Sequence, residues 1–190
     1  MSLDKGSLLL ELARRAIAAR LGISSSAPDI AAADWLQAKA ATFVTLTIHS
    51  QLRGCIGTLK AYRPLIDDVQ SNAVAAAFHD PRFPPLAADE YESIRLEVSL
   101  LSAMQPLTVA DESAALAAIR PGIDGVVLGY GAHKGTFLPQ VWEQLSEPAQ
   151  FMAHLKLKAG LIAGFWHPDM RLFTYQVEKF READREAGEL

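Results

Sequence analysis

One short segment of the chain combines residue types that could carry out chemistry: Leu52-Arg53-Gly54-Cys55-Ile56-Gly57. Cys55 is the only cysteine among 190 residues, so it forms no disulfide within the chain. Because side chains alternate along a strand, Arg53 and Cys55 are expected on one face, roughly 6.5–7 Å apart. A neighbouring cation favours the thiolate, the nucleophilic form of cysteine. The spacing therefore predicts an activated thiol, or two groups that bind one anion.

The alternative is a structural role for the same residues. Free cysteine is among the most buried residue types, so Cys55 could instead be a small residue of the core. Gly54 and Gly57 each weaken a strand by about 0.5–1 kcal/mol relative to alanine. Gly57 leaves room on the face of Cys55, where a ligand or another backbone could approach. Both glycines are therefore candidate binding residues, and the spacing leaves the two interpretations open.

Arg82 and His79 are candidates from a segment stiffened by prolines, residues 79–85. The guanidinium of Arg82 could bind a carboxylate or a phosphate through two hydrogen bonds. It could equally form a salt bridge with Asp80 that holds the segment. His79 could act as a base for Cys55, or it could be an exposed histidine stabilised by the dipole at a helix end.

Glu97 and Ser99 share the polar face of an alternating segment, residues 94–100. If this face meets the strand of Cys55, Glu97 could pair with Arg53 or orient a base, and Ser99 could contact a ligand. If it faces solvent, neither residue has a role. The candidate catalytic residues are thus Cys55, His79 and Glu97. The candidate substrate-binding residues are Arg53, Gly54, Gly57, Arg82 and Ser99.

The elements that must position these residues follow from hydrophobic periodicity and from turn residues. The predicted helices cover 7–21, with Ser7 as its cap, 65–77, 111–119, with Asp111 as its cap, and 148–160. The predicted strands cover 44–48, 52–58, 94–100, 124–130, 135–138 and 172–180. Hairpins outnumber strand–helix–strand units, so we expect an α+β fold with a mainly antiparallel sheet and flanking helices.

Composition and motifs exclude several classes of function. A net charge of −4 and an isoelectric point near 5.7 argue against a broad nucleic-acid surface. The five histidines lack metal-ligand spacing, and no glycine-rich phosphate loop is present, so neither a metal nor a cofactor is predicted. The start lacks the pattern of a signal peptide, and no apolar stretch is long enough to span a bilayer. Together with the lone cysteine, this predicts a cytoplasmic protein that does not enter membranes.

The thiol segment and further motifs, in order, resemble the AMMECR domain family, whose bacterial members are called AmmeMemoRadiSam system protein A. The motifs span roughly residues 43–180: Leu52-Arg53-Gly54-Cys55-Ile56-Gly57, Pro64-Leu65-Ile66, Asp80-Pro81-Arg82-Phe83-Pro84-Pro85-Leu86, Glu97-Val98-Ser99, Gly135-Thr136-Phe137-Leu138-Pro139-Gln140-Val141 and Lys158-Ala159-Gly160-Leu161. The resemblance implies a single domain over 1–190 with two lobes. The larger lobe would hold both termini, the smaller would be inserted, and the thiol segment would lie near the cleft.

The resemblance also implies a shared pathway with a Memo-like protein and a radical SAM protein, but no mechanism. The leading hypothesis is a thiol-dependent small-molecule or modification enzyme with Cys55 as nucleophile or covalent anchor. Arg53 and Arg82 would hold a small anionic ligand, and His79 or Glu97 would move protons. The alternative is a non-catalytic adaptor that presents a ligand to those partners. A nucleic-acid-binding role is weaker because the chain is acidic.

Overall fold

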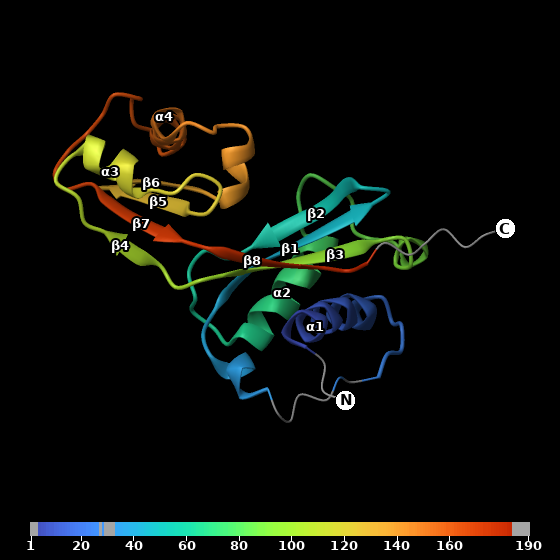
Figure 1. The fold of residues 1–190 in the computed structure, drawn as a ribbon. Coiled ribbons are helices and arrows are strands. Elements are labelled where there is room, and N and C mark those ends of the chain that lie inside the picture. The colour runs from blue at the N-terminus through green and yellow to red at the C-terminus, as the bar shows by residue number, and fades with distance from the viewer. Residues whose placement is uncertain (1–3, 27, 29–32, 184–190) are drawn as a thin grey trace. The chain divides into compact units, whose positions relative to one another are not determined.

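The computed structural model describes residues 4–26, 28 and 33–183, which form two compact units. The first unit contains the described residues of Met1–Leu101 and Glu178–Leu190, and the second is Ser102–Val177. Each unit contains a four-stranded sheet with helices (Figure 1). The predicted α+β class, with antiparallel pairing and flanking helices, is confirmed. The assignment of 1–190 to a single domain with two lobes stays a prediction.

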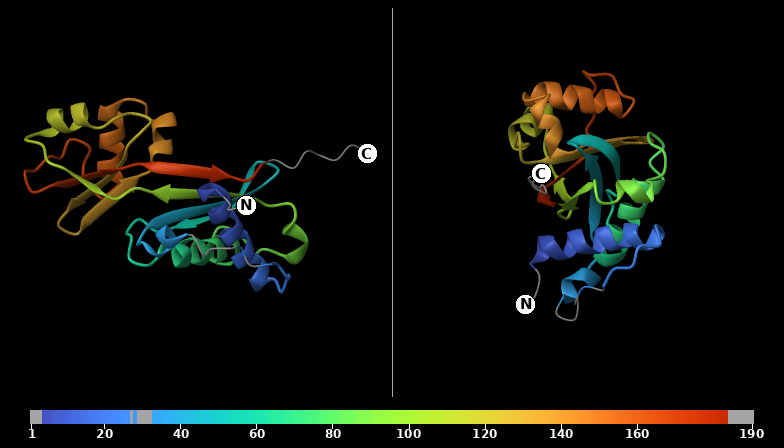
Figure 2. Two further views of the ribbon diagram at one scale, coloured as in Figure 1. Left: turned by 60° about the horizontal axis from the view of Figure 1, so that its bottom comes forward. Right: turned by 90° about the vertical axis from the view of Figure 1, so that its right-hand side faces the viewer.

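The sheet of the first unit has the strand order β2-β1-β3-β8, in which β1 pairs antiparallel with both β2 and β3. Its elements are α1 (Lys5–Arg20), β1 (Ala41–Ile48), β2 (Gln51–Gly57), α2 (Leu65–Phe78), β3 (Arg95–Leu101) and β8 (Val177–Arg181), with short 3-10 turns at Asp34–Gln37 and Ala88–Glu90. The two helices pack against each other and lie on the same side of this sheet (Figures 1 and 2).

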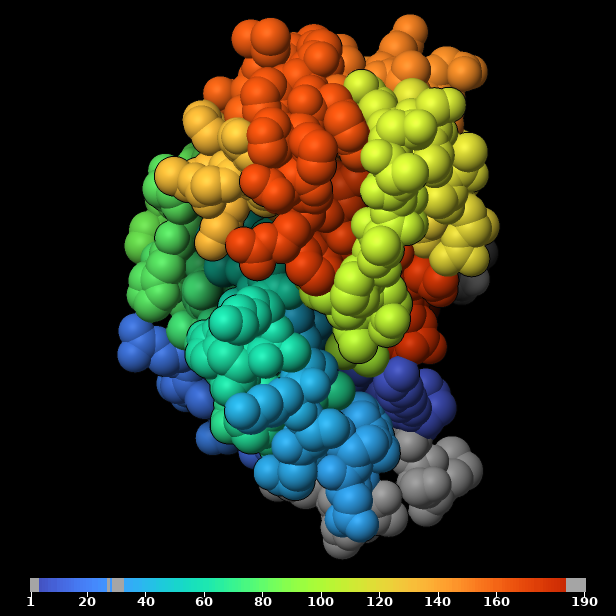
Figure 3. All heavy atoms as spheres, turned by 90° about the vertical axis from the view of Figure 1, so that its left-hand side faces the viewer, coloured from blue at the N-terminus to red at the C-terminus, as the bar shows by residue number. Residues whose placement is uncertain are grey.

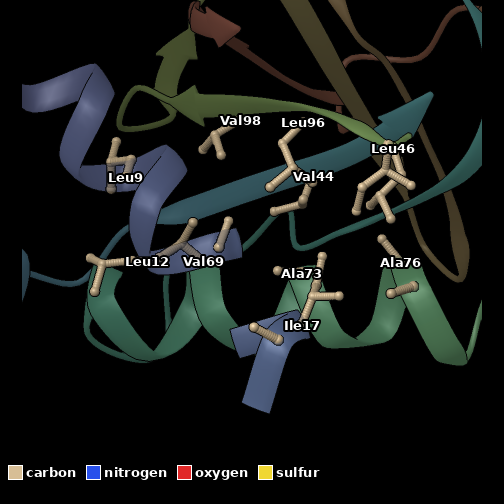
Figure 4. Packing of buried hydrophobic residues seen from close by; sticks show 14 of the residues in the cluster. Leu9, Leu12, Ile17, Val44, Leu46, Val69, Ala73, Ala76, Leu96 and Val98 are labelled. Carbon is tan, nitrogen blue, oxygen red and sulfur yellow. The ribbon is translucent and has the colours of Figure 1, made fainter. Parts of the chain in front are cut away.

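Alternation along the strands separates a core face from a second face. Val44 and Leu46 of β1, with Leu96 and Val98 of β3, are almost fully buried and point toward the helices (Figure 4). They meet apolar side chains of α1 and α2, such as Leu9 (Figure 4). Because neighbouring residues of a strand point to opposite faces, the residues between them lie on the face away from α1 and α2.

The ends of the elements depend on local hydrogen bonds. The carboxylate of Asp4 accepts from the backbone N–H groups of Gly6 and Ser7, so α1 begins earlier than the predicted cap at Ser7. The turn between β1 and β2 is His49–Ser50, and both residues have positive φ, at 49° and 63°. Such a two-residue turn matches the twist of a hairpin, although asparagine and glycine adopt it more easily.

The sheet of the second unit has the strand order β4-β7-β5-β6, with every neighbouring pair antiparallel. Its elements are β4 (Gln105–Leu107), α3 (Glu112–Ala118), β5 (Gly125–Tyr130), β6 (His133–Phe137), a 3-10 turn (Pro139–Glu143), α4 (Pro148–Lys158) and β7 (Arg171–Tyr175). The core includes Trp142, whose ring stacks on Phe151 with 3.8 Å between ring centres. Asp111 caps α3 as predicted, because its carboxylate accepts from Ala114 N–H.

The prediction of one continuous last strand over 172–180 is wrong. The chain leaves β7 at Tyr175 and enters β8 at Val177, and these strands belong to different sheets. Gln176 stands between them and is held by Ser102: its N–H donates to the Ser102 hydroxyl at 2.9 Å, and its carbonyl accepts from Ser102 N–H at 2.8 Å. Apolar and polar residues keep alternating where the chain passes from one sheet to the other, so the sequence pattern alone does not reveal the break between β7 and β8.

A buried lysine in the second unit gives a stability prediction. The side chain of Lys156 in α4 is fully buried and donates to Glu112 of α3 and to the carbonyl of Ala163, while Glu112 keeps 35% of its side chain exposed. Glu112→Gln should lower the unfolding free energy by about 2–3 kcal/mol, because a buried ammonium loses its counter-charge. Lys156→Met should cost about 1 kcal/mol or less, because the remaining carboxylate reaches water.

Chemical denaturation of the two variants tests this asymmetry. Equal losses, or a larger loss for Lys156→Met, would contradict the proposed cost of an unpaired buried charge.

Candidate functional site

Cys55 lies in a row of three residues across the first sheet. Its partner on β1 is Thr45, and the partner of Thr45 on β3 is Glu97. Directly opposite residues share a face, so all three side chains lie on the face away from α1 and α2. The Thr45 hydroxyl donates to Cys55 Sγ at 3.2 Å, and the cysteine is half-buried. The thiol therefore has a hydrogen-bond donor, and it is not sealed in the core.

Arg53 has no directly opposite partner on β1, because the register between β1 and β2 shifts by one residue at its position. Leu46 pairs with Gly54, but the next residue, Thr47, pairs with Leu52. The guanidinium binds both carboxylate oxygens of Glu90, at 2.7 and 2.8 Å. It also donates to the carbonyls of Pro84 and Pro85 at 3.0 and 3.4 Å. All three of its nitrogens are thus occupied by the chain, and the segment 84–90 is fixed to β2.

The Arg53–Glu90 pair favours the charged form of both groups. Its hydrogen bond to Arg53 lowers the pKa of Glu90, against a smaller opposing effect of burial. The same hydrogen bond raises the pKa of Arg53. An external anion at Arg53 would therefore have to displace an internal carboxylate.

Arg82 and Asp80 bind each other and the backbone of Cys55. The guanidinium of Arg82 contacts both Asp80 oxygens, at 2.9 and 2.7 Å, so the salt-bridge alternative is present. Asp80 also accepts from Cys55 N–H at 2.9 Å, and Arg82 donates to the Cys55 carbonyl at 3.2 Å. Asp80 is nearly fully buried, and its hydrogen bond to Arg82 holds its pKa far below the usual range despite that burial. The pair locks the backbone on both sides of the thiol.

Arg82 is more accessible to a ligand than Arg53. Its side chain is 54% exposed, against 12% for Arg53. Its Nε and one terminal nitrogen carry the bonds to Asp80 and Cys55. Within the described residues the other terminal nitrogen has no hydrogen bond, so it could bind a ligand. The pKa of Arg82 is raised mainly by its hydrogen bond to Asp80, with smaller electrostatic contributions that include Cys55. Of the two arginines, Arg82 is therefore the one that binds the backbone of Cys55.

The two glycines of the segment allow close packing. A Cβ placed on Gly54 would lie 2.1 Å from the backbone carbonyl oxygen of Ala76 in α2. A Cβ placed on Gly57 would lie 2.2 Å from the ring of Phe43. Neither position accepts a side chain without movement of its neighbour. Each glycine thus has a structural reason to be present, whatever it does for a ligand.

The other predicted site residues are placed as follows. Glu97 pairs with Arg181 and, at 3.8 Å, with Lys179, both of β8, and not with Arg53. Ser99 is buried on the same strand, opposite Phe43. His79 is exposed at the C-terminal end of α2, where its N–H closes the helix on Ala75.

Three residues with a role at or beside the segment were not predicted. Thr45 is indistinguishable in sequence from Thr47, which shares its strand and its alternation. Glu90 lies 37 residues from Arg53, and nothing in the sequence connects the two. Asp68 of α2 is fully buried and accepts hydrogen bonds from Thr42, Thr58, Arg63 and Asn72. It fixes the start of α2 to the strands that carry the thiol.

Two further observations concern the described parts of the chain, 4–26, 28 and 33–183. Among these residues no three His, Cys, Asp or Glu side chains gather closely enough to hold a metal ion. No helix formed by them has the length and apolar character needed to cross a bilayer.

Comparison with known proteins places the chain in a family. Residues 10–180 match the family model described as AMMECR1. A protein of Methanothermobacter thermautotrophicus is 37% identical over 96% of both chains. Protein MK0488 of Methanopyrus kandleri is 33% identical over 98% of this chain and 92% of its own. These names state no activity.

A solved structure agrees with this placement. The crystal structure of the uncharacterized protein PH0010 from Pyrococcus horikoshii has a TM-score of 0.79 and 31% identity, and covers 93% of this chain and 91% of that chain. Sequence and fold thus lead to the same assignment, and the chain belongs to the AMMECR1 family.

Proposed function

We propose that the protein is a thiol-dependent enzyme of small-molecule or modification chemistry, with Cys55 as its nucleophile. The observation that carries the proposal is the half-buried sulfur that accepts a hydrogen bond from Thr45. Three neighbours of Cys55 in the segment have packing roles: Arg53 binds Glu90, and the two glycines admit α2 and Phe43. These contacts make a rigid frame around Cys55.

The chemistry would begin with the thiolate. The Cys55 sulfur forms a bond to an electrophilic carbon of the substrate, and the bond from that carbon to its leaving group breaks. The electron pair of the broken bond leaves with that group, and the thiol proton passes to solvent or to a base. The hydrogen bond that the sulfur accepts from Thr45, and the guanidinium of Arg82 on the carbonyl of the same residue, support this role.

The predicted binding residues take unequal parts in this proposal. Arg82 would hold an anionic group of the substrate with its remaining terminal nitrogen. Arg53 would act by positioning, since its own nitrogens hold the segment 84–90. Gly54, Gly57 and Ser99 would shape the surroundings of Cys55. Glu97, in the same row, and His79, at the helix end, remain the candidates for moving protons.

Removing the hydroxyl of Thr45 tests the activated thiol. Thr45→Val should slow alkylation of Cys55 by iodoacetamide at pH 7 by about threefold. Valine cannot donate the hydrogen bond to the sulfur, and a rise of about 0.7 kcal/mol in the barrier, a typical size for one lost hydrogen bond, makes the reaction about threefold slower. Because the chain has one cysteine, mass spectrometry of the whole protein measures this site alone.

Thr47→Val is the matched control, on the same strand and face two residues away. In this variant, iodoacetamide should alkylate Cys55 at the wild-type rate. A wild-type profile of rate against pH that matches free cysteine would remove the nucleophile role, as would no labelling of the folded protein.

A second candidate is a non-catalytic adaptor that presents a ligand to a Memo-like protein or a radical SAM protein. It is favoured by the internal carboxylates that already occupy Arg53 and Arg82. The variant Cys55→Ser separates the two candidates. An adaptor would still co-purify with these partners and sustain their output, whereas an enzyme would lose its output while keeping its fold.

A further inference from the structure

The second unit contains an apolar pocket that is separate from Cys55. Its volume is about 390 Å³, within the range of small-molecule sites. One wall is β4 with the residues that follow it, to Ala110, and the other is the segment from Trp166 to Phe173. These two segments, yellow-green and orange, lie side by side on the face shown in Figure 3.

The pocket exposes side chains that also belong to the core of this unit. Leu107, Val109, Trp166 and Met170 each pack against the buried cluster and also line the pocket. Each is only partly buried, so the apolar core of the unit is open to solvent at this point. Water in such a space makes few hydrogen bonds, and an apolar group that replaces it is stabilised.

The pocket has one charged lining residue, Arg171, and one other polar side chain, Thr108. Arg171 is exposed and, in the part of the chain that the structure describes, forms no ion pair. Arg53, Arg63 and Arg120, by contrast, each bind a carboxylate. An unpaired guanidinium beside an apolar hollow complements a ligand with one anionic group and an apolar body.

We infer that this pocket binds a small amphipathic acid, with its aromatic or branched apolar body against Trp166 and its carboxylate on Arg171. The lining side chains apart from Arg171 and Thr108 are mainly apolar, so a ligand with many polar groups would lose water without finding enough partners. The single cation selects one negative charge. This site is independent of the proposal for Cys55, and no residue is shared between them.

Two fluorescent probes test the contribution of Arg171 and that of the apolar walls separately. Anilinonaphthalene sulfonate carries one anionic group on an apolar body, and phenylnaphthylamine is its neutral counterpart. Both should bind the wild-type protein at one site. Arg171→Gln should lower the affinity for the anionic probe by about tenfold or more, because the charged hydrogen bond is lost. The affinity for the neutral probe should not change.

Two further variants control the experiment. Lys134→Gln removes an exposed positive charge from the same unit outside the pocket, and should change neither probe. Ala110→Phe fills the pocket from its rim without removing a core side chain, and should weaken both probes. Circular dichroism checks that each variant is folded.

Competition identifies the class of ligand. Phenylbutyrate should displace the anionic probe at a concentration about tenfold below that of phenylbutyramide, which lacks the charge. Equal displacement, equal binding to Arg171→Gln, or binding that survives Ala110→Phe would each overturn the inference. Displacement by an apolar peptide with a free carboxyl end, but not by the free acid, would also overturn it in favour of a peptide site.

Discussion

Replacing Gly54 by alanine is expected to lower the unfolding free energy by about 3 kcal/mol or more. The new Cβ would lie 2.1 Å from the carbonyl oxygen of Ala76 and 3.0 Å from its carbon. These atoms belong to the backbone of α2, so no side-chain rotation can relieve the contact. The helix would have to move away from β2, which would separate a close-packed core. A loss of this size is a large fraction of the stability of a typical domain.

Gly129→Ala is the matched control for this experiment. Gly129 is also a strand glycine, in β5, and a Cβ there would meet nothing within 4 Å. Its replacement should change stability by less than about 1 kcal/mol, in the stabilising direction, because alanine restricts the unfolded chain. Urea denaturation followed by circular dichroism measures both variants. Similar values for the two would show that α2 does not press on β2.

Replacing Asp68 by alanine should have a comparable effect, about 3–5 kcal/mol, for a different reason. Its buried carboxylate accepts from the Thr42 N–H at 2.8 Å, the Thr42 hydroxyl at 2.7 Å and Arg63 Nε at 2.8 Å. The Thr58 hydroxyl and the Asn72 amide complete the group. Alanine would remove the acceptor of the Thr42 N–H and of Arg63 Nε, and each buried unsatisfied group is costly. The Asn72 amide would keep its bond to the Thr42 carbonyl.

The neighbouring Asp67 provides the control. It occupies the same first turn of α2 but is exposed, so Asp67→Ala loses only a favourable interaction with the helix dipole, about 0.3–1 kcal/mol. Thermal unfolding of both variants tests the difference. Similar midpoints for Asp67→Ala and Asp68→Ala would mean that the buried network does not stabilise the protein.

Much of the fold follows from short-range patterns. The strands at 44–48 and 52–58 were predicted, the first from alternation and the second from the short loop before it, and Asp111 was predicted as a cap. Where local signals compete, the prediction fails: Asp4 and Ser7 are both able to cap a helix, and only the coordinates show that Asp4 does so. The three-residue strand β4 has too few residues for alternation to be detected.

The candidate site depends on contacts between distant residues, and these were predicted only in part. The Asp80–Arg82 pair is close in sequence and was one of two stated alternatives. Glu90 was not predicted, because any acidic residue downstream could have met Arg53 equally well. The register shift beside Arg53 was also unforeseen, since it depends on how β2 fits β1 and not on the residue types in β2.

Asp67 and Asp68 illustrate the same limit within one turn of helix. They are identical in type and adjacent, yet one is exposed and the other is fully buried. The difference arises because Thr42, Thr58 and Arg63 approach from other elements. A carboxylate in a helix is usually exposed, so only a three-dimensional arrangement of donors reveals the exception.

The side chains bound to the Cys55 backbone also affect whether β2 can pair with a strand of another molecule. β2 is one of the two edge strands of its sheet, and unpaired N–H and C=O groups on such a strand can pair with strands of other molecules, which can begin aggregation. Here Asp80 and Arg82 already take both groups of Cys55. An incoming strand would have to displace a carboxylate and a guanidinium that neutralise each other. The proline-rich segment thus covers this edge of the sheet and makes the addition of a strand from another molecule beside Cys55 unfavourable.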